Sequence, residues 1–304
     1  MILIGLGLAF IAIRGIPSYP VKAINYRANP TPEKLARGKV LVSTLCAGCH
    51  MNTDTRTLTG QRMLDVPAEF GTIYSPNITQ DRTYGIGEWT DGEILYLLRT
   101  GIKRDGQYAP PYMAKLPTMA DNDIASIIAF LRSDDPLVAP DPTPDQPVEP
   151  SFLVKLLSAV AFKPLPYPEQ PIPMPDTTNM VELGKYYAHN LDCFSCHSAD
   201  FKTNNFLEPV KSVGYFGGGL SLLNKKGQSI VAQNLTPDKK SGIGNWTEEQ
   251  FVKAVKYGMK DGEEALRYPM LPYVHLTDQE IGSIYHYLMT IPAIENQIER
   301  STLE

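Results

Sequence analysis

The chain has 304 residues, of which 43% are hydrophobic and 20% are charged, a composition typical of globular proteins that argues against wholesale disorder. The length suits about two domains, and the net charge of -5 without a basic block argues against a nucleic-acid-binding protein. All four cysteines lie in two short motifs, which leaves none for a structural disulfide and excludes a disulfide-stabilised secreted scaffold.

The first segment, residues 1–30, begins with the apolar run MILIGLGLAFIAI, followed by Arg14. A membrane-spanning helix needs about 20 such residues, so this run alone is short. A cleavable signal peptide ends in a small-residue cleavage site, whereas this run continues into RGIPSYP. We therefore interpret residues 1–30 as a membrane anchor and an extended connector. A signal peptide and a helix buried in the soluble part are the alternatives.

A helix is predicted directly before each cysteine motif. In the first half Thr31 is a suitable N-cap, and the helical pattern EKLARGKVLVSTL continues to Cys46. In the second half MVELGKYYAHNLD runs into Cys193 with one residue more. Gly38 and Gly184 occupy corresponding places. Because glycine weakens a helix interior by about 1 kcal/mol relative to alanine, we expect a close helix crossing at each of them.

Each predicted helix leads into a C-x-x-C-H motif, first in LCAGCH at residues 45–50 and then in CFSCH at 193–197. In c-type haem attachment the two thiols bond to the haem and the adjacent histidine binds the iron. A redox-active cysteine pair and a zinc site are alternatives, but neither accounts for a histidine after each second cysteine. We therefore predict two covalently attached haem c groups, bound by Cys46, Cys49 and His50 and by Cys193, Cys196 and His197.

The two halves of the chain are copies of one module. NITQDRTYGIGEWT at residues 77–90 matches NLTPDKKSGIGNWT at 234–247, which lies 157 residues later. The same offset aligns residues 120–133 with 277–290, and both segments predict an amphipathic closing helix. Neither half shows the alternating pattern of a strand. The sequence therefore predicts an all-α fold of two small domains, residues 31–133 and 179–292.

A ligand in one copy should have a counterpart in the other. At the offset of 157 residues Met113, in APPYMAKLP, corresponds to Met270, in RYPMLPY, and no other methionine of the repeats is paired in this way. Both lie in proline-rich loops that precede the closing helices. We predict that Met113 completes the iron coordination of His50 and that Met270 completes that of His197. Core packing of the methionines is the alternative, and His275 is the competing ligand in the second domain.

Three further features have both a structural and a functional interpretation. Trp89 and Trp246 occupy matching positions, where they either contact the haem or fill the core beside the next helix. His189 and His286 are expected to be packing or surface histidines. The glycine-rich FGGGL at 216–220 lacks the spacing of a phosphate-binding loop, and we expect a flexible loop there.

Residues 134–178 form a proline-rich linker, with 12 of the 26 prolines of the chain. Proline at this density favours an extended chain. Within the linker, SFLVKLLSAVAF at 151–162 is a short apolar helix candidate, which either packs between the domains or contacts a membrane or a partner subunit. Residues 293–304 are a C-terminal tail.

These features resemble a known family. Two C-x-x-C-H motifs, each followed by NxT…GIGxWT and a proline-flanked methionine, look like tandem class I cytochrome c domains. They are similar to the membrane-associated cytochrome c subunits that accompany bacterial alcohol, gluconate and aldehyde dehydrogenases. The resemblance covers about residues 31–133 and 179–292. This chain departs from those subunits in its two haem motifs, where many carry three, and in its N-terminal apolar segment.

The resemblance implies an electron-transfer protein, rather than an enzyme, on the periplasmic side of the bacterial cytoplasmic membrane, and the apolar N-terminal segment predicts that it is anchored there. Its donor would be a membrane dehydrogenase or a quinol-oxidising complex, and its acceptor a terminal oxidase or a soluble cytochrome. We expect it to be a subunit of a larger membrane complex, with no nucleic-acid partner. Two alternatives stay open: a di-haem peroxidase-like enzyme with one open iron, and a structural or assembly subunit of a respiratory complex.

Overall fold

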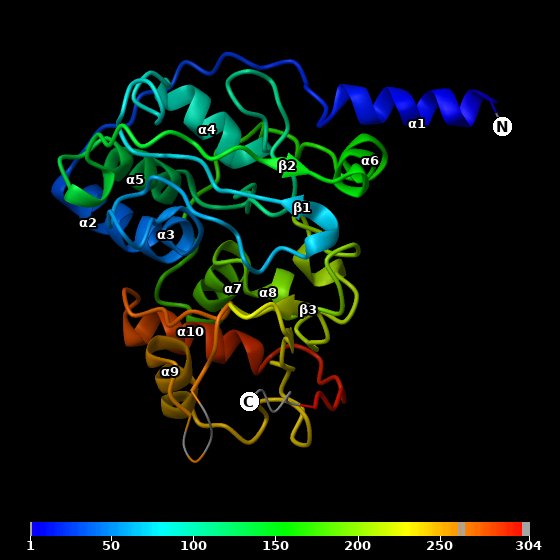
Figure 1. The fold of residues 1–304 in the computed structure, drawn as a ribbon. Coiled ribbons are helices and arrows are strands. Elements are labelled where there is room, and N and C mark those ends of the chain that lie inside the picture. Colours follow the sequence, from blue (N-terminus) through cyan, green and yellow to red (C-terminus); the bar gives the residue numbers. More distant parts are fainter. Residues whose placement is uncertain (1, 261, 263–264, 300–304) are drawn as a thin grey trace. The chain divides into compact units, whose positions relative to one another are not determined.

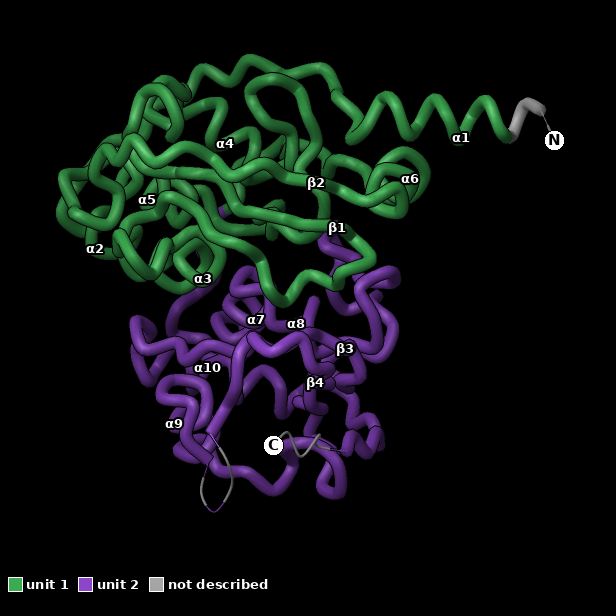
Figure 2. Tube along the Cα trace, viewed as in Figure 1, with its two compact units in different colours: residues 1–172 green, residues 173–304 purple. Residues whose placement is uncertain are grey.

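The computed structural model describes residues 2–260, 262 and 265–299, and the chain divides into two compact units, residues 1–172 and 173–304 (Figure 2). Each unit contains one of the two C-x-x-C-H motifs. Met1, in the predicted anchor, and residues 300–304, in the predicted tail, lie outside the described residues.

Helices make up most of the regular structure of both units (Figure 1). The first unit contains α1 (Ile2–Arg14), α2 (Pro32–Leu41), a π-helical turn (Val42–Cys46), α3 (Ala47–His50), α4 (Asp91–Thr100), α5 (Asp121–Leu131), α6 (Phe152–Val160), two 3-10 turns (Ala68–Phe70 and Pro136–Val138) and the strands β1 (Gly71–Thr72) and β2 (Glu149–Pro150). The second unit contains α7 (Met180–Asn190), α8 (Cys193–Cys196), α9 (Glu248–Tyr257), α10 (Asp278–Leu288), a 3-10 turn (Pro209–Lys211) and the strands β3 (Ser221–Leu223) and β4 (Ser229–Val231).

Side chains at the helix N-termini explain where these helices begin. Thr31 caps α2 by accepting a hydrogen bond from the Lys34 N–H, as predicted. Thr90 and Thr247, the last residues of the two GIGxWT segments, each form a capping box with the third residue of the helix that follows. The repeated sequence segment therefore ends where α4 and α9 start.

The helix before each motif crosses the closing helix at a glycine, as the sequence predicts. In the first unit α2 packs against α5, and a Cβ atom at Gly38 would lie 2.0 Å from the Ser126 carbonyl oxygen. In the second unit α7 packs against α10, and a Cβ atom at Gly184 would lie 1.8 Å from the Ser283 carbonyl oxygen. No side chain fits at either crossing, which is why glycine is used despite its helix-weakening effect.

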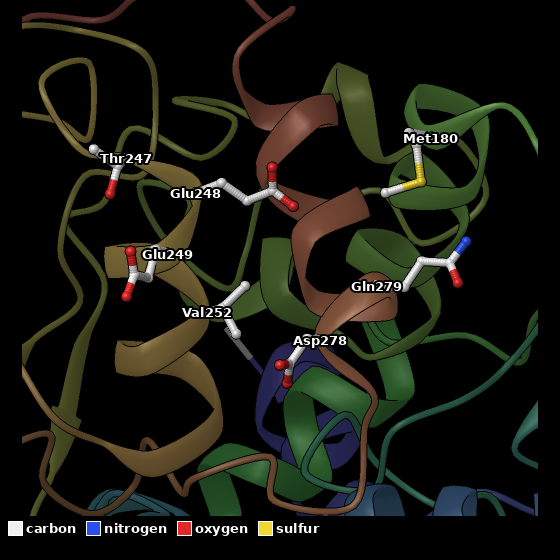
Figure 3. Close-up of a pocket in the computed structure, with 7 residues that line it drawn as sticks. All are labelled: Met180, Thr247, Glu248, Glu249, Val252, Asp278 and Gln279. Carbon is white, nitrogen blue, oxygen red and sulfur yellow. The ribbon is translucent and has the colours of Figure 1, made fainter.

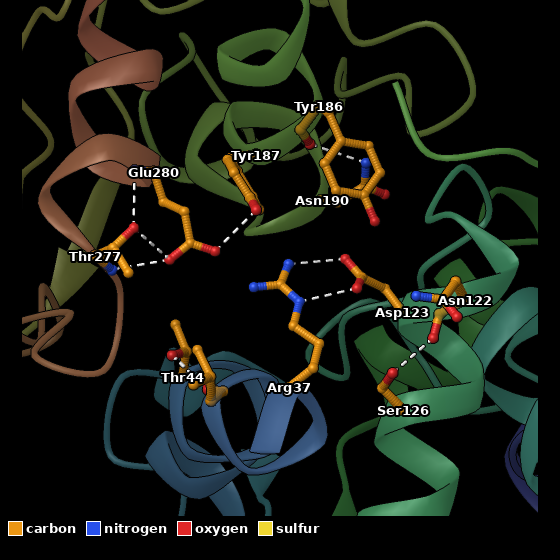
Figure 4. A network of polar contacts seen from close by, with 11 residues as sticks. Arg37, Thr44, Asn122, Asp123, Ser126, Tyr186, Tyr187, Asn190, Thr277 and Glu280 are labelled. Carbon is orange, nitrogen blue, oxygen red and sulfur yellow. Dashed lines mark hydrogen bonds and ion pairs between the residues drawn. The ribbon is translucent and has the colours of Figure 1, made fainter. Parts of the chain in front are cut away.

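A polar contact fixes each of these helix pairs, with different residues in the two units (Figure 4). Arg37 on α2 forms a bidentate pair with the buried Asp123 on α5, with both N···O distances at 2.9 Å. In the second unit the Tyr187 hydroxyl donates to Glu280 on α10 at 2.8 Å. Asp123 and Glu280 are equivalent in the repeat, so the acidic position is retained while its partner has changed.

The closing helices supply much of the core of each unit. The apolar positions predicted for them are buried, apart from the half-buried Tyr285, whose hydroxyl donates to the Trp246 carbonyl oxygen. The buried set comprises Ile124, Ile127, Ile128 and Leu131 on α5 and Ile281, Ile284 and Leu288 on α10. The equivalent aromatics Phe130 and Tyr287 are also buried.

The proline-rich segment up to residue 172 belongs to the first unit, rather than lying free as a linker. The buried Asn77 side chain donates to the carbonyl oxygens of Asp141 and Thr143, both at 2.9 Å. Further along, the Leu165 N–H donates to Thr100, and Ile172 exchanges hydrogen bonds with Asp121. Proline keeps this segment extended, but its remaining polar groups still find partners on the domain surface.

The all-α prediction needs a correction, because the described chain also contains two short antiparallel ribbons. Strands β1 and β2 pair within the first unit, with Gly71 opposite Pro150. Strands β3 and β4 form a hairpin around the turn at Gly227, which has a positive φ of 74°. This hairpin lies in the stretch where the second domain is longer than the first. Strands of two or three residues are too short to give a recognisable alternation.

Helix α1 lies at the surface of the first unit and packs against α6. Its exposed apolar side chains argue against the alternative of a buried helix; they are Leu6, Leu8, Phe10 and Ile13. Helix α6 buries Val154 and leaves Phe152, Leu153 and Val160 exposed. Among the helices of the described residues, none is both long enough and apolar enough to cross a bilayer.

Alanine at either crossing glycine should force the helices apart. We expect Gly38→Ala and Gly184→Ala each to lower the free energy of unfolding by about 3 kcal/mol, measured by urea denaturation. The control is Gly7→Ala in α1, where no atom lies within 4 Å of the added Cβ, and it should be neutral. Wild-type stability of Gly184→Ala would contradict the close crossing.

Candidate functional site

The first motif lies on a continuous helical segment. After α2 the chain passes through the π-helical turn and into α3, so that Cys46, Cys49 and His50 follow one another along one helical path. In the second unit α7 ends at Asn190, and Asp192 takes a left-handed conformation with φ of 62° before α8 begins at Cys193. The one additional residue that the sequence shows here is thus absorbed by a turn.

The two motif histidines are oriented by the same backbone contact. Nδ1 of His50 lies 2.8 Å from the Pro76 carbonyl oxygen, and Nδ1 of His197 lies 2.8 Å from that of Gln233. A carbonyl oxygen only accepts hydrogen bonds, so Nδ1 carries the hydrogen and Nε2 keeps its lone pair. This is the arrangement that a metal-binding histidine requires, with its second nitrogen held by an outer partner. Pro76 and Gln233 are equivalent in the repeat.

Burial also favours the neutral form of both rings. It lowers the pKa of His50 and of His197, while the hydrogen bond to the backbone carbonyl acts in the opposite direction. A neutral imidazole is the form that binds iron. Both motif histidines therefore fit the proximal side of a haem, which is the role that the motif predicts.

The cysteines do not have the character of a redox pair. Burial raises the pKa of the Cys46 thiol to about 12 and that of Cys193 to about 12. A redox-active C-x-x-C pair instead has a thiol whose pKa is lowered. In the part of the chain that the structure describes, no group of three or more His, Cys, Asp or Glu side chains is arranged to hold a metal ion by itself. The raised thiol pKa values argue against the redox-active cysteine pair.

In each domain a glycine with positive φ hydrogen-bonds the backbone of the motif histidine. The Gly60 N–H donates to the His50 carbonyl oxygen at 2.7 Å, and the Gly218 N–H donates to that of His197 at 2.8 Å. Their φ values are 87° and 71°, which side chains disfavour. Gly218 belongs to FGGGL, which is therefore a packed loop rather than the flexible one that we predicted. The sequence concealed this because such hydrogen bonds join residues far apart in the chain.

The two predicted methionine ligands lie in turns of the same geometry. The Met113 N–H donates to Pro110 at 3.1 Å, and the Met270 N–H donates to Arg267 at 2.9 Å, an equivalent pair. Both methionines are partly exposed, so neither behaves as a core side chain. In contrast, Met119, which has no methionine counterpart, is fully buried.

Each methionine loop is tied to the preceding helix. The Leu116 N–H donates to Leu98 at 2.7 Å, and the equivalent Tyr273 N–H donates to Val255 at 2.9 Å. In the second unit the loop also reaches the motif, because the Tyr273 hydroxyl lies 3.5 Å from the Leu191 carbonyl oxygen. Burial, with the cysteine thiols of the motif as a further cause, raises the Tyr273 pKa well above its ordinary value. The fold thus brings the Met270 loop to the second motif.

Two asparagines of the repeat have a role that sequence reasoning left unassigned. Asn77 and Asn234 are buried, and the side-chain oxygen of each accepts both the N–H and the hydroxyl of the threonine two residues on. The amide nitrogen of Asn234 donates to Ile294, from the segment predicted as a tail. These asparagines directly follow Pro76 and Gln233, so they position the carbonyls that hold the histidines. The sequence feature that could have indicated this role is the N-x-T pattern, which occurs at the same place in both copies of the repeat.

The structure also gives the burial and the neighbours of the two matched tryptophans and of two of the remaining histidines. Trp89 and Trp246 are half-buried, with the Arg104 guanidinium 5.9 Å and the Lys260 ammonium 5.2 Å from the respective ring centroids. His275, the competing ligand, is exposed. His286 is half-exposed and lies 3.1 Å from Glu248.

His189 forms part of an aromatic cluster in the second unit. Its Nε2 contacts the Tyr215 hydroxyl, which lies 2.7 Å from that of Tyr287, and its ring packs edge-on against Phe194. Burial, with a smaller effect of Lys185, lowers the pKa of His189 to about 4. The equivalent of Tyr287 in the first unit is Phe130, which has no hydroxyl for such a cluster. His189 is a packing residue, as expected.

A shallow acidic groove lies on the second unit (Figure 3). It is formed where α9 and α10 begin, beside the first residue of α7. Its lining residues are Met180, Thr247, Glu248, Glu249, Val252, Asp278 and Gln279. None of them is one of the eight predicted haem-binding residues.

Comparison with known proteins gives a match to the family described as cytochrome c, over residues 35–134 and 181–292. The fructose dehydrogenase cytochrome subunit of Gluconobacter japonicus is 29% identical over 300 residues, which cover 92% of this chain and 56% of that protein. The cytochrome c subunit of the quinone-dependent alcohol dehydrogenase of Gluconacetobacter polyoxogenes is 28% identical, covering 82% and 54%. A diheme cytochrome c-type protein of Cereibacter sphaeroides is 26% identical, covering 95% and 98%.

The chain spans little more than half the length of the two dehydrogenase subunits. It matches the diheme protein over nearly the full length of both. Each of the two family matches contains one C-x-x-C-H motif and one of the paired methionines.

The buried His189 should make stability depend on pH. Its folded pKa of about 4 lies below the ordinary 6.5, so its contribution is fully present above pH 6.5 and is lost as the pH falls towards 4. We expect a loss of about 3 kcal/mol over this range, which His189→Gln should remove, in urea denaturation at a series of pH values. Equal pH dependence of wild type and His189→Gln would contradict the assignment.

Proposed function

The chain belongs to the cytochrome c family, and we propose that it relays electrons as the cytochrome subunit of a membrane dehydrogenase. It carries two covalently bound haem c groups, and the pairs Cys46/Cys49 and Cys193/Cys196 fit their attachment. When bound, each haem supplies an iron that reversibly takes up one electron. The dehydrogenase assignment is supported by relatives named as cytochrome subunits of fructose and alcohol dehydrogenases.

The observation that carries this proposal is the pairing of the methionines. We propose that His50 and Met113 would bind the haem iron in the first domain, and that His197 and Met270 would bind it in the second. A thioether ligand stabilises the reduced state and raises the reduction potential. An iron bound by both side chains would have no position free for peroxide or oxygen, which favours electron transfer over the peroxidase-like alternative. The protein's part is to hold these four side chains in place.

The role of the histidines follows from their hydrogen bonds. Because Nδ1 is committed to a backbone carbonyl, the ring cannot rotate without losing a hydrogen bond in a buried place. That fixes Nε2 as the atom available to iron in both domains. The carbonyl partner also increases the basicity of the ring, which strengthens its bond to the metal.

We also propose that α1 attaches the chain to the periplasmic side of the bacterial cytoplasmic membrane. Support comes from its exposed apolar side chains, including Leu6, Phe10 and Ile13, and from the absence of acidic residues in this helix. Helix α6, which packs on α1, adds exposed apolar side chains at Phe152 and Val160. An exposed apolar surface of this kind is typical of a site that contacts lipid or a partner protein.

Replacing either methionine should open the iron of one domain only. We expect Met113→Ala and Met270→Ala each to give one high-spin haem of lowered reduction potential, with loss of part of the methionine-to-iron charge-transfer absorbance. The control is Met119→Ala, which removes a core side chain and should keep that absorbance intact while costing about 2–5 kcal/mol of stability. A wild-type protein that already contains a high-spin haem would instead favour the peroxidase-like alternative.

The partner assignment is tested by purification from membranes. We expect the tagged, haem-loaded chain to co-purify from detergent-solubilised membranes with the catalytic subunit of a dehydrogenase, whose substrate should reduce both haems. Removal of residues 2–14 should release the chain from the membrane fraction and leave its visible spectrum unchanged. Haems that stay oxidised when the co-purified enzyme is given its substrate would favour the structural or assembly role.

A further inference from the structure

Arg99, in the last turn of α4, is a buried cation that binds the chain between Met113 and the start of α5. Its side chain is 1% exposed, which is rare for arginine and requires that its donors be satisfied. Nη1 donates to the carbonyl oxygens of Leu116 at 2.7 Å and Met119 at 2.6 Å, and Nη2 donates to Asp121 at 2.6 Å. The two carbonyl acceptors belong to the segment that joins Met113 to α5, and Asp121 is the first residue of α5.

A second cation holds the other side of the same loop. The Lys115 ammonium is buried, donates to the Pro110 carbonyl oxygen at 2.8 Å and lies 5.1 Å from the centre of the Tyr108 ring. Pro110 is the residue whose carbonyl also accepts the Met113 N–H. Met113 therefore lies between two points at which a buried cation binds the backbone of its loop.

The second domain lacks this arrangement. The equivalent of Arg99 is Lys256, which pairs with Asp278 at 2.6 Å. Among the described residues, no hydrogen bond joins Lys256 to the carbonyl oxygens of Tyr273 or Leu276, the equivalents of those that Arg99 binds. The equivalent of Lys115 is Pro272, which has no donor.

We propose that Arg99 is a positioning residue that holds Met113 against the iron of the first domain, an inference that rests on Met113 being the axial ligand. A thioether is a weak neutral ligand, so its occupancy depends on how little its loop can move away. Arg99 supplies two charge-assisted hydrogen bonds to the backbone of this loop, which would be broken or strained if the loop opened. Its third hydrogen bond anchors the guanidinium to Asp121 on α5. The first domain should therefore exchange its methionine more slowly than the second.

Displacement of methionine by added imidazole tests this in the full-length, haem-loaded, oxidised protein. The wild type should show two kinetic phases, and Met113→Ala and Met270→Ala should each remove one, which assigns them. Arg99→Met should accelerate the first-domain phase by about tenfold or more and leave the other unchanged. Arg99→Lys, which retains a charge but not the planar fork, should lie between.

The matched control is Lys256→Met, which should change the second-domain phase by less than about threefold, because an exposed ion pair contributes little. If Arg99 has a purely structural role, its substitution should lower the melting temperature and leave the displacement rate at about 25 °C unchanged. If Arg99→Met fails to fold, the first-domain displacement rate of Arg99→Lys tests the proposal instead.

Two results would overturn the proposal. One is a folded Arg99 variant whose first-domain phase stays within about twofold of the wild type. The other is a first-domain phase that survives in Met113→Ala, which would remove the ligand assignment and the positioning role together. Loss of that phase in Met113→Ala with no effect of Arg99 would leave the ligand assignment standing and reject only the positioning role.

Discussion

In each half of the chain the helix that leads into the cysteine motif lies directly on the closing helix, in contact through Gly38 or Gly184. The carbonyl oxygen of the facing residue occupies the space that a side chain would need. Because each motif immediately follows its helix, this crossing sets where the cysteines and the histidine lie. Because each methionine loop ends at the same closing helix, the crossing also relates the methionine to the histidine.

The two domains retain backbone contacts more faithfully than side chains. The carbonyls that hold His50 and His197 come from a proline in one domain and a glutamine in the other, at the same distance of 2.8 Å. The turns at Met113 and Met270 repeat one hydrogen bond in the same way. Every residue type supplies the same backbone carbonyl, so the hydrogen bonds that orient the histidines can be retained while the side chains around them change.

Where the domains differ, the differences lie around the ligands rather than in them. The first domain has Arg99 and Lys115 at its methionine loop, and the second has the His189 cluster beside its motif. The surroundings of a haem tune its potential and its ligand exchange. Two haems with the same predicted ligand types can therefore differ in reduction potential and in ligand exchange.

The sequence by itself determined the duplication, the helices, the cofactor and the pairing of Met113 with Met270, because these depend on local spacing and on comparison of one half with the other. The glycine crossings were also predictable, because glycine weakens a helix interior and its use there indicates close contact with another element. The hairpin at Gly227, the packing of FGGGL and the attachment of the proline-rich segment through Asn77 were decided only by the tertiary structure. So was the burial of Arg99. Each of these depends on hydrogen bonds between residues distant in sequence, for which no local pattern exists.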